Sequence, residues 1–255
     1  MLKNKNVVIT GGSDGIGLAI SRKFAENGAN LLLLARNTDK LELVQKELIK
    51  YKTEVHILSA DLLNVKNLKN ISKQVLQIMP QVDILVNNAG IARFVPFEEM
   101  DEELLDLHLN VNVKSLYLFT MYLFDSIKSQ KGNILNISSY FSHRMLPGRA
   151  TTAYSMSKGA VDAFTKSLAF ETGKYNVRVN AIAPGSISTN QLNYNFEQLS
   201  DEGKIEFNNL IKSIYPLQRI GEAEDISEMA LFLVSEKAKW ITGSIMAVDG
   251  GLTTN

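Results

Sequence analysis

Seven short apolar runs recur along the 255-residue chain, and a longer segment separates each run from the next. They read NVVIT, NLLLLA, VHILSA, DILVNNAG, GNILNISS, VRVNAIAPG and SIMAVDGG. Runs this uniformly apolar are typical of parallel strands buried on both faces, because a strand with one wet face alternates apolar and polar residues. This pattern constrains the fold more than any other feature, since parallel strands need long connections between them.

The segments between the runs carry helical patterns. After Ile16, the apolar residues Ala19, Ile20 and Phe24 follow one helix face, and Gly28 supplies a stop signal. Strands alternating with helices over the whole length predict one doubly wound α/β domain. The only long irregular stretch is 186–215, which is rich in Asn, Gln and aromatic residues. An insertion after the C-terminal end of a strand is where a substrate lid would lie.

The composition argues against several functional classes. Lys plus Arg and Asp plus Glu both total 27, which gives no reason to expect a nucleic acid or an acidic membrane as partner. No cysteine is present, and no His, Asp and Glu cluster has metal-site spacing, so we expect no metal. The N-terminal MLKNKNVVIT lacks the apolar core of a secretory signal. The nearly uncharged run 115–124 is shorter than the roughly 20 residues of a membrane span, so we expect a cytoplasmic protein.

The stretch TGGSDGIG at 10–17 fits two kinds of site. Residues 11–15 match G-x-S-x-G, the strained turn that presents the nucleophile of a serine hydrolase. Such an enzyme places its acid and then its histidine after the serine, and it takes an oxyanion donor from an earlier strand. The chain has only His56, His108 and His143, none in its C-terminal third, and one strand precedes Ser13. The chain order therefore argues against a hydrolase.

The same stretch suits a turn that binds phosphate. It follows the first strand, Gly11 and Gly12 allow a tight turn, and the later glycines let the backbone approach a ligand. The helix from Ile16 would direct its N-terminal N–H groups at a pyrophosphate. The spacing is G-x-x-x-G-x-G, so the usual G-x-G-x-x-G pattern is not met literally. A plain tight turn is the alternative, but the place between strand and helix favours a cofactor, with Ser13 as a loop donor.

About 20 residues after the glycines, the second apolar run ends in Ala35-Arg36, with no carboxylate before Asp39. An acidic residue here would accept hydrogen bonds from the ribose 2′-OH of NAD, whereas arginine suits the 2′-phosphate of NADP. A guanidinium can bind phosphate through two parallel hydrogen bonds. A solvated arginine at a strand end explains Arg36 equally well at this point.

Tyr154 and Lys158 stand four residues apart in YSMSK, so on a helix they share one face. Of the eight tyrosines, only Tyr154 has a lysine at this spacing. Exposed pairs of this kind arise by chance in many helices, but the chemistry here is coherent. Tyrosine titrates near 10, too high for efficient proton transfer at neutral pH. A nearby ammonium and an oxidised nicotinamide would stabilise phenolate, and lowering its pKa by about three units corresponds to about 4 kcal/mol.

Further motifs follow the other strands, namely ADLL, NNAG, NVNVKS, NISS, the Pro184-Gly185 end of VRVNAIAPG, and ITGSIMAVDGG. With TGGSDGIG and YSMSK they cover essentially the whole chain, and the set resembles the short-chain dehydrogenase/reductase family. The resemblance is to its shorter branch with T-G-x-x-x-G-x-G and Y-x-x-x-K motifs, similar to 3-oxoacyl-[acyl-carrier-protein] reductase-like enzymes. It implies one Rossmann-type NAD(P)-binding domain over 1–255, with a doubly wound parallel seven-stranded sheet, helices on both faces and a lid at about 186–215.

The resemblance also implies four catalytic residues. Tyr154 would exchange a proton with the carbonyl or hydroxyl oxygen of the substrate, and Ser139 would hydrogen-bond and orient the same oxygen. Lys158 would lower the pKa of Tyr154 and hold the nicotinamide ribose. Asn112, in NVNVKS, matches a helix-interior asparagine that completes a water-linked proton relay to the lysine. Without the resemblance, Asn112 would be a mildly unfavourable helix residue.

The same match assigns the cofactor contacts. Asp61 and Leu62 lie on the adenine side, and Asn88 lies where the backbone meets the adenosine ribose. Ile187 and Thr189 match positions that hold the carboxamide and fix which nicotinamide face is presented. The predicted cofactor set is Gly11, Ser13, Asp14, Ile16, Arg36, Asp61, Leu62, Asn88, Tyr154, Lys158, Ile187 and Thr189.

The cofactor expected is NADP(H) in preference to NAD(H). Asp14 stands where many NADP-preferring relatives carry a basic residue, and its charge would not favour a 2′-phosphate. The usual NAD-selecting acid is also absent at Ala35, so the preference rests mainly on Arg36. An NAD-dependent secondary-alcohol or sugar dehydrogenase is the alternative. A non-catalytic dinucleotide-binding regulator would have little need for the catalytic set.

The substrate is expected to be a small carbonyl or alcohol compound. Between Ser139 and Tyr154 the chain is slightly longer than is usual in the family. Pro147-Gly148 follows Ser139 by the usual number of residues. The extra residues therefore fall within RATTA, at the substrate mouth. The lid residues Asn193, Tyr194, Phe196 and Phe207 fit steroids, quinones, acyl thioesters and sugars alike. His143 is either a substrate contact or a polar loop residue, while His56 and His108 are expected to be structural.

The run SLYLFTMYLF at 115–124 is apolar around its whole circumference, whereas a helix flanking a sheet needs only one apolar stripe. Something must cover its other face. We therefore expect a homo-oligomer, either a tetramer as in many relatives or a dimer. This helix and the one after Tyr154 would form a two-fold interface, and SIMAVDGG would form a second.

Overall fold

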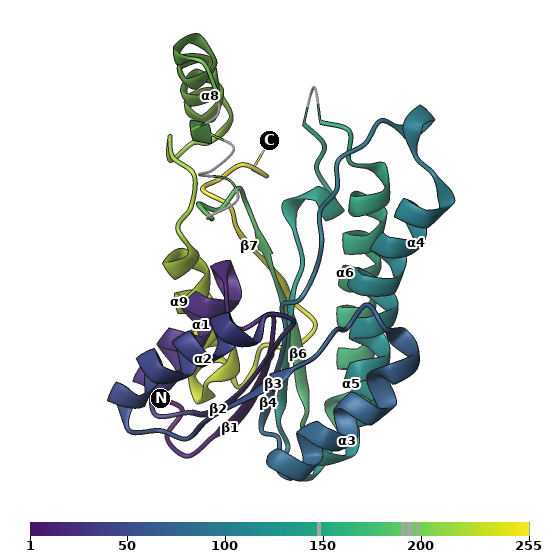
Figure 1. The fold of residues 1–255 in the computed structure, drawn as a ribbon, viewed down its shortest axis with the longest axis vertical. Helices are drawn as coiled ribbons and strands as arrows, with labels where there is room; N and C mark the ends of the chain where they lie inside the picture. The colour runs from purple at the N-terminus through teal and green to yellow at the C-terminus, as the bar shows by residue number, and fades with distance from the viewer. Residues whose placement is uncertain (147–148, 190–191, 193–195, 198, 255) are drawn as a thin grey trace.

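The computed structural model describes residues 1–146, 149–189, 192, 196–197 and 199–254. Within these ranges the strands form one parallel seven-stranded sheet in the order β3-β2-β1-β4-β5-β6-β7, with helices on both faces (Figure 1). The prediction of a doubly wound, Rossmann-type α/β sheet is confirmed. The described helices include none that is both long and apolar enough to cross a membrane.

Each of the seven apolar runs contributes one strand. They are β1 (Asn6–Thr10), β2 (Asn30–Ala35), β3 (Val55–Ser59), β4 (Ile84–Asn87), β5 (Asn133–Ile137), β6 (Arg178–Pro184) and β7 (Ile245–Val248). The α-helices are α1 (Gly15–Glu26), α2 (Thr38–Leu48), α3 (Leu68–Ile78), α4 (Glu102–Leu109), α5 (Leu116–Ser129), α6 (Thr152–Thr172), α8 (Asp201–Ile214) and α9 (Ala223–Val234).

The sheet separates two hydrophobic cores, as its uniformly apolar strands require. Val7 and Ile9 of β1 point into a core formed with α1, α2 and α9. Val8, between them, points into the opposite core with α3, α5 and α6. All three side chains are fully buried. Neighbouring residues of a strand thus serve opposite faces, which explains why both must be apolar.

The strand order reverses at β1, which pairs with β2 on one side and β4 on the other. In open α/β sheets, ligands bind in the crevice beyond the carboxyl ends of the strands at such a reversal. The TGGSDGIG turn leaves β1 here and the NNAG loop leaves β4. The topology therefore places these two motifs side by side.

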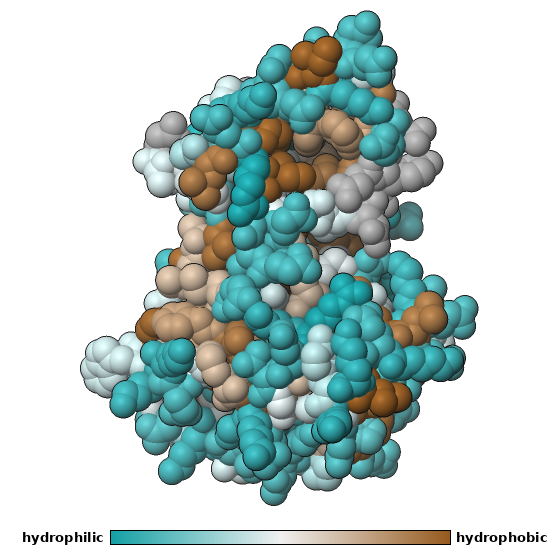
Figure 2. Space-filling model, turned by 90° about the vertical axis from the view of Figure 1, so that its left-hand side faces the viewer, coloured by the Kyte–Doolittle hydropathy of each residue, from teal (hydrophilic) through white to brown (hydrophobic). Residues whose placement is uncertain are grey.

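The predicted lid segment is described in part. Helix α8 rises away from the sheet at the top of the molecule (Figure 1). Phe196 and Phe207 are in contact, with ring centroids 5.3 Å apart. Asn193 and Tyr194 lie outside the described residues, as do Pro147 and Gly148. Figure 2 shows apolar side chains gathered beneath α8, above a largely hydrophilic lower face.

Candidate active site

The glycine turn after β1 brings the N-terminus of α1 close to the sheet. Gly11 has a φ of +66°, in the left-handed region that favours glycine. A Cβ on Gly17 would lie 2.1 Å from the carbonyl oxygen of Gly11, so only glycine fits there. Asp14 caps α1, because its Oδ1 accepts a hydrogen bond from Gly15 N at 2.8 Å. The turn and the first N–H groups of α1 thus form a cradle suited to an anion.

The NNAG loop is fastened to this turn through two side chains. Thr10 Oγ1 accepts hydrogen bonds from the backbone N–H groups of Asn88 and Ala89, both at 3.0 Å. Asn88 Nδ2 donates to the carbonyl oxygens of Thr10 and Gly11 at 3.0 and 3.1 Å. Since the Asn88 side chain is used internally, its predicted contact with an adenosine ribose would come from its backbone.

A groove of about 380 Å³ opens between the two motifs and the ends of β2 and β3. It is lined by seven of the predicted cofactor residues, namely Gly11, Ser13, Asp14, Arg36, Asp61, Leu62 and Asn88. Arg36 is exposed at its edge, beside Asn37 and Lys40. A cradle for phosphate at one end and a cationic edge at the other fit the adenosine half of a dinucleotide.

The residues predicted for the nicotinamide side lie past the other edge of the glycine turn. Thr189 lies over the start of α1, since its Cγ2 would be 3.6 Å from a Cβ on Gly15. The Ile187 side chain is buried in the core beside α1 and α9, and Ile16 packs against the same core. Ile187 also forms a parallel bridge with Gly221, which holds the loop after β6 in place.

Helix α6 presents the predicted catalytic pair to the end of β5. Ser139, the second residue after β5, is buried, and its hydroxyl hydrogen-bonds the phenol of Tyr154. Lys158 is also buried, and its Nζ donates to the Ile137 carbonyl oxygen at 2.8 Å. The Ser138 hydroxyl has a different partner, because its Oγ donates to Asp162 Oδ1. The fold therefore brings Ser139, and not Ser138, to Tyr154.

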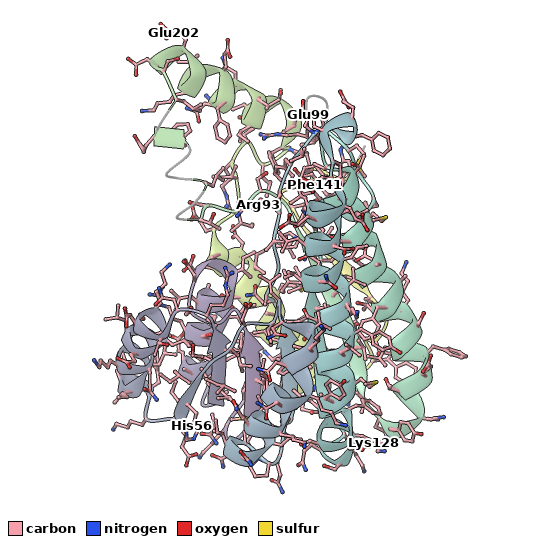
Figure 3. The ribbon with its side chains drawn as sticks, turned by 45° about the vertical axis from the view of Figure 1, so that its right-hand side comes forward. His56, Arg93, Glu99, Lys128, Phe141 and Glu202 are labelled. Carbon is pink, nitrogen blue, oxygen red and sulfur yellow. The ribbon has the colours of Figure 1, made fainter. Side chains whose placement is uncertain are left out.

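Aromatic rings enclose Tyr154. The ring centroids of Phe94, Phe141 and His108 lie 5.8, 6.1 and 6.4 Å from that of Tyr154. Figure 3 shows Phe141 and Arg93 in one region, between α8 and the upper ends of α4 and α6. These rings give Tyr154 largely apolar surroundings.

The lowered Tyr154 pKa is predicted for a site that also holds an oxidised nicotinamide, and in the protein alone the shift is in the opposite direction. Burial raises the pKa of Tyr154, and the hydrogen bond from Ser139 opposes this only in part. Lys158 does not offset the burial, because its Nζ lies 5.8 Å from the centroid of the Tyr154 ring and is bound to the Ile137 carbonyl. The phenol is therefore held in its neutral form, which can donate a proton.

Burial also lowers the pKa of Lys158 to about 8, while the nearby carboxylate of Asp162 acts in the opposite direction. The ordinary value of 10.5 applies in the unfolded chain. Between these values the unfolded chain binds one more proton than the folded one, so this group makes stability rise with pH by up to about 1.4 kcal/mol per unit. Below pH 8 both states are protonated and the contribution is constant.

We therefore predict that the difference in unfolding free energy between wild type and Lys158→Met increases from pH 8 to 9.5, in favour of wild type. Urea unfolding of both proteins across this range measures it. Lys166→Met, at an exposed site on the same helix, is the matched control and should track wild type. Parallel curves for wild type and Lys158→Met would show that the lysine titrates at its ordinary pKa.

Asn112 lies in a π-helical turn, Asn110–Ser115, between α4 and α5. Its Oδ1 accepts from Ile91 N, and its Nδ2 donates to Ile91 O and to Ser157 Oγ, each at 2.9 Å. A Cβ on Gly90 would lie 3.1 Å from Asn112 Oδ1 and 3.6 Å from Lys158 Nζ. Asn112 thus fixes the loop after β4 against α6, close to Lys158. Its part in a proton relay stays a prediction.

The structure adds residues that the sequence did not indicate as part of the site. His108 is fully buried, accepts from Arg93 N at 3.2 Å and contacts the Leu104 carbonyl through Nδ1 at 2.9 Å. These two bonds fasten the ring between α4 and the loop after β4. Phe94 and Lys40 had no sequence signal either. The π-helical turn is typical of functional sites but is not visible in a sequence. His143 is exposed and contacts Ser142 Oγ through Nδ1.

No group of His, Cys, Asp and Glu within the described ranges could hold a metal ion. The site presents a hydroxyl, a phenol and an ammonium next to the groove. Groups of this kind suit proton transfer to an oxygen atom next to a bound dinucleotide.

Comparison with known proteins agrees with this class of site. Residues 11–253 match the family model described as enoyl-(acyl carrier protein) reductase. The chain therefore belongs to the short-chain dehydrogenase/reductase family and is an oxidoreductase acting on carbonyl or alcohol groups.

Its relatives differ in their substrates. It is 36% identical over 256 residues to a 3-oxoacyl-[acyl-carrier-protein] reductase of Chlamydia trachomatis, covering 99% of this chain and 98% of that protein. It is 35% identical over 254 residues to the oxidoreductase UcpA of Salmonella typhimurium, covering 99% and 95%. L-sorbose reductase from Gluconobacter frateurii, solved with NADPH and L-sorbose, superposes with a TM-score of 0.93 at 29% identity, covering 100% and 98%.

Proposed function

We propose that this oxidoreductase uses NADP(H) and reduces a carbonyl compound, or oxidises the corresponding alcohol, with Tyr154 as the acid/base. The observation that carries the proposal is the hydrogen bond between Ser139 and Tyr154 inside an aromatic wall. The Gly11–Gly17 cradle and the groove leading from it would hold the dinucleotide. The single domain over 1–255, with its lid at about 186–215, belongs to the same proposal.

In the reducing direction, a nicotinamide held by the cradle and groove would supply a hydride to the carbonyl carbon. Ser139 holds the carbonyl oxygen by a hydrogen bond, and Tyr154 transfers its phenolic proton to that oxygen. Lys158 would hold the nicotinamide ribose and, together with the oxidised nicotinamide, favour the phenolate that remains. The neutral phenol that burial favours is the form needed at the start of this direction. In oxidation the proton moves the opposite way.

NADP(H) is proposed in preference to NAD(H) because Arg36 stands at the groove edge and its neighbour Ala35 occupies the position where NAD enzymes carry an acid. The sorbose reductase with a similar fold was solved with NADPH, which supports the proposal. An NAD-dependent secondary-alcohol or sugar dehydrogenase is the second candidate, since the catalytic groups would be the same.

The substrate class is best determined by direct screening. Purified protein is mixed with NADPH or NADH and a panel of 3-oxoacyl thioesters, ketoses, quinones and steroid ketones, and the cofactor absorbance is followed. The proposal expects NADPH consumption with at least one carbonyl class and slower consumption with NADH. NADH turnover exceeding NADPH turnover for every active substrate would contradict the cofactor assignment.

We also propose that the protein is a cytoplasmic homo-oligomer, a tetramer or else a dimer. Apolar side chains lie exposed on α5 and α6, including Tyr117, Met121 and Phe170, of which Phe170 is 92% exposed. Trp240, in the segment before β7, is 97% exposed. Covering such side chains would stabilise an assembly.

Light scattering after size exclusion should therefore give a multiple of the 28.3 kDa chain mass at micromolar concentration. Phe170→Glu and Trp240→Glu should each lower that mass, because the first places a charge in the proposed α5/α6 interface and the second places one beside the β7 run that would form the other interface. Leu43→Glu, on the exposed side of α2, is the matched control and should leave it unchanged. A monomeric wild type would refute the proposal.

A further inference from the structure

An ion pair lies at the edge of the groove that holds Arg36. Lys40 Nζ is 2.5 Å from Asp14 Oδ2. The two residues come from different motifs, since Asp14 caps α1 and Lys40 lies in the first turn of α2. Both line the groove. Lys40 is held in position from the backbone, because its N–H donates to Asn37 Oδ1 at 2.8 Å.

Asp14 has a structural role that conflicts with binding of an anion. Its Oδ1 caps α1 through the N–H of Gly15, so a carboxylate here strengthens the turn that forms the phosphate cradle. The same negative charge repels the 2′-phosphate of NADP, which carries about −1.5 to −2 charges at neutral pH by analogy with other phosphate monoesters. A second acid, Asp61, also lines the groove and accepts from Leu63 N.

The net charge of the side chains that line this groove depends on its two cations. In the described part of the chain no acidic side chain forms an ion pair with Arg36. Arg36 and Lys40 together offset Asp14 and Asp61, whereas Arg36 alone would leave one negative charge in excess. Because opposite charges in contact largely cancel at longer range, a phosphate beside Arg36 meets a neutralised Asp14.

We propose that Lys40 is a specificity-determining residue, which by pairing with Asp14 allows the groove to accept a 2′-phosphate beside Arg36. The inference rests on the proposed preference for NADP(H) and extends it to a residue pair. It also explains how the chain retains Asp14 at a position where an acid would otherwise oppose NADP.

The test uses binding of nucleotide fragments and needs no turnover. Isothermal titration calorimetry at low ionic strength compares 2′,5′-ADP with 5′-AMP for wild type, Lys40→Met, Asp14→Asn and the double variant. Lys40→Met should weaken 2′,5′-ADP about tenfold more than it weakens 5′-AMP, because both carry the 5′-phosphate and only the former carries the 2′-phosphate. Lys46→Met, exposed on the same helix, is the matched control and should match wild type.

The double variant separates neutralisation of Asp14 from direct binding of the phosphate. If Lys40 acts on Asp14, removing both charges should restore 2′,5′-ADP affinity to within about threefold of wild type. A double variant as weak as Lys40→Met would overturn the inference, since Lys40 would then bind the phosphate itself. Thermal melting of each variant verifies that it is folded.

The outcomes also distinguish this inference from the proposed cofactor. Preference of wild type for 2′,5′-ADP with no loss in Lys40→Met would overturn the role of Lys40 and leave the NADP assignment standing. Equal affinity of wild type for the two nucleotides would overturn the NADP assignment and the role of Lys40 with it.

Discussion

Replacing Tyr154 with phenylalanine should lower turnover about 10²–10⁴-fold while changing cofactor affinity by no more than about threefold. The substitution removes only the phenolic oxygen, which is the atom that hydrogen-bonds Ser139 and would exchange the proton. A phenylalanine ring keeps the packing against Phe94, Phe141 and His108. The loss should therefore appear in the chemical step, with the fold and the groove retained.

Stopped-flow kinetics of NADPH consumption, together with fluorescence titration of NADPH, measure the two quantities separately. Tyr122→Phe on α5 is the matched control, because it removes the same oxygen at a distance from the site. It should retain wild-type rates. A Tyr154→Phe protein that turns over at the wild-type rate would show that another group transfers the proton.

Replacing Arg36 with aspartate should reverse the cofactor preference. We expect kcat/KM with NADPH to fall about 100-fold, because a bidentate donor to the 2′-phosphate becomes a repelling carboxylate. The same carboxylate would accept hydrogen bonds from a ribose 2′-OH, so kcat/KM with NADH should rise. Steady-state kinetics with both cofactors and one substrate measure the change.

Arg36→Gln provides the control for charge. It should lose NADPH activity as Arg36→Asp does, but it should gain less with NADH because a neutral amide is a weaker acceptor for the ribose hydroxyl. If NADPH turnover survives in Arg36→Asp while NADH turnover does not improve, Arg36 does not select the cofactor.

The fold could be predicted because its signal is local. Val7, Val8 and Ile9 are all apolar, and in the sheet successive residues serve opposite cores. A strand with one wet face would have placed a polar residue at Val8. The reversal of strand order at β1 has no such signature, because it depends on which distant strands pair.

The site could be predicted only where a motif or the family resemblance marked its residues. Tyr154 and Lys158 were indicated by their spacing, whereas Asn112 was indicated by the resemblance alone. Lys40 and His108 act through partners 26 and 15 residues away, Asp14 and Arg93, and nothing in their neighbourhood marks them.

The pKa of Tyr154 is another property of the site that the sequence does not determine. Spacing on a helix places Lys158 on the right face, but it does not show where Nζ points. In the structure Nζ binds the Ile137 carbonyl, and burial of the phenol outweighs its hydrogen bond to Ser139. Desolvation depends on the surrounding fold, so a sequence motif does not determine the direction of the pKa shift in the protein without cofactor.

We propose that Tyr154 and Ser139 face a nicotinamide whose diphosphate is held by the Gly11–Gly17 turn. A crystal structure of the protein with NADP⁺ is the most direct test of this arrangement. We expect the diphosphate at the start of α1, and the reactive ring carbon beside a gap about 3 Å from both hydroxyl oxygens, where a carbonyl oxygen fits. A nucleotide bound elsewhere, or a ring out of reach of the Tyr154 hydroxyl, would contradict it.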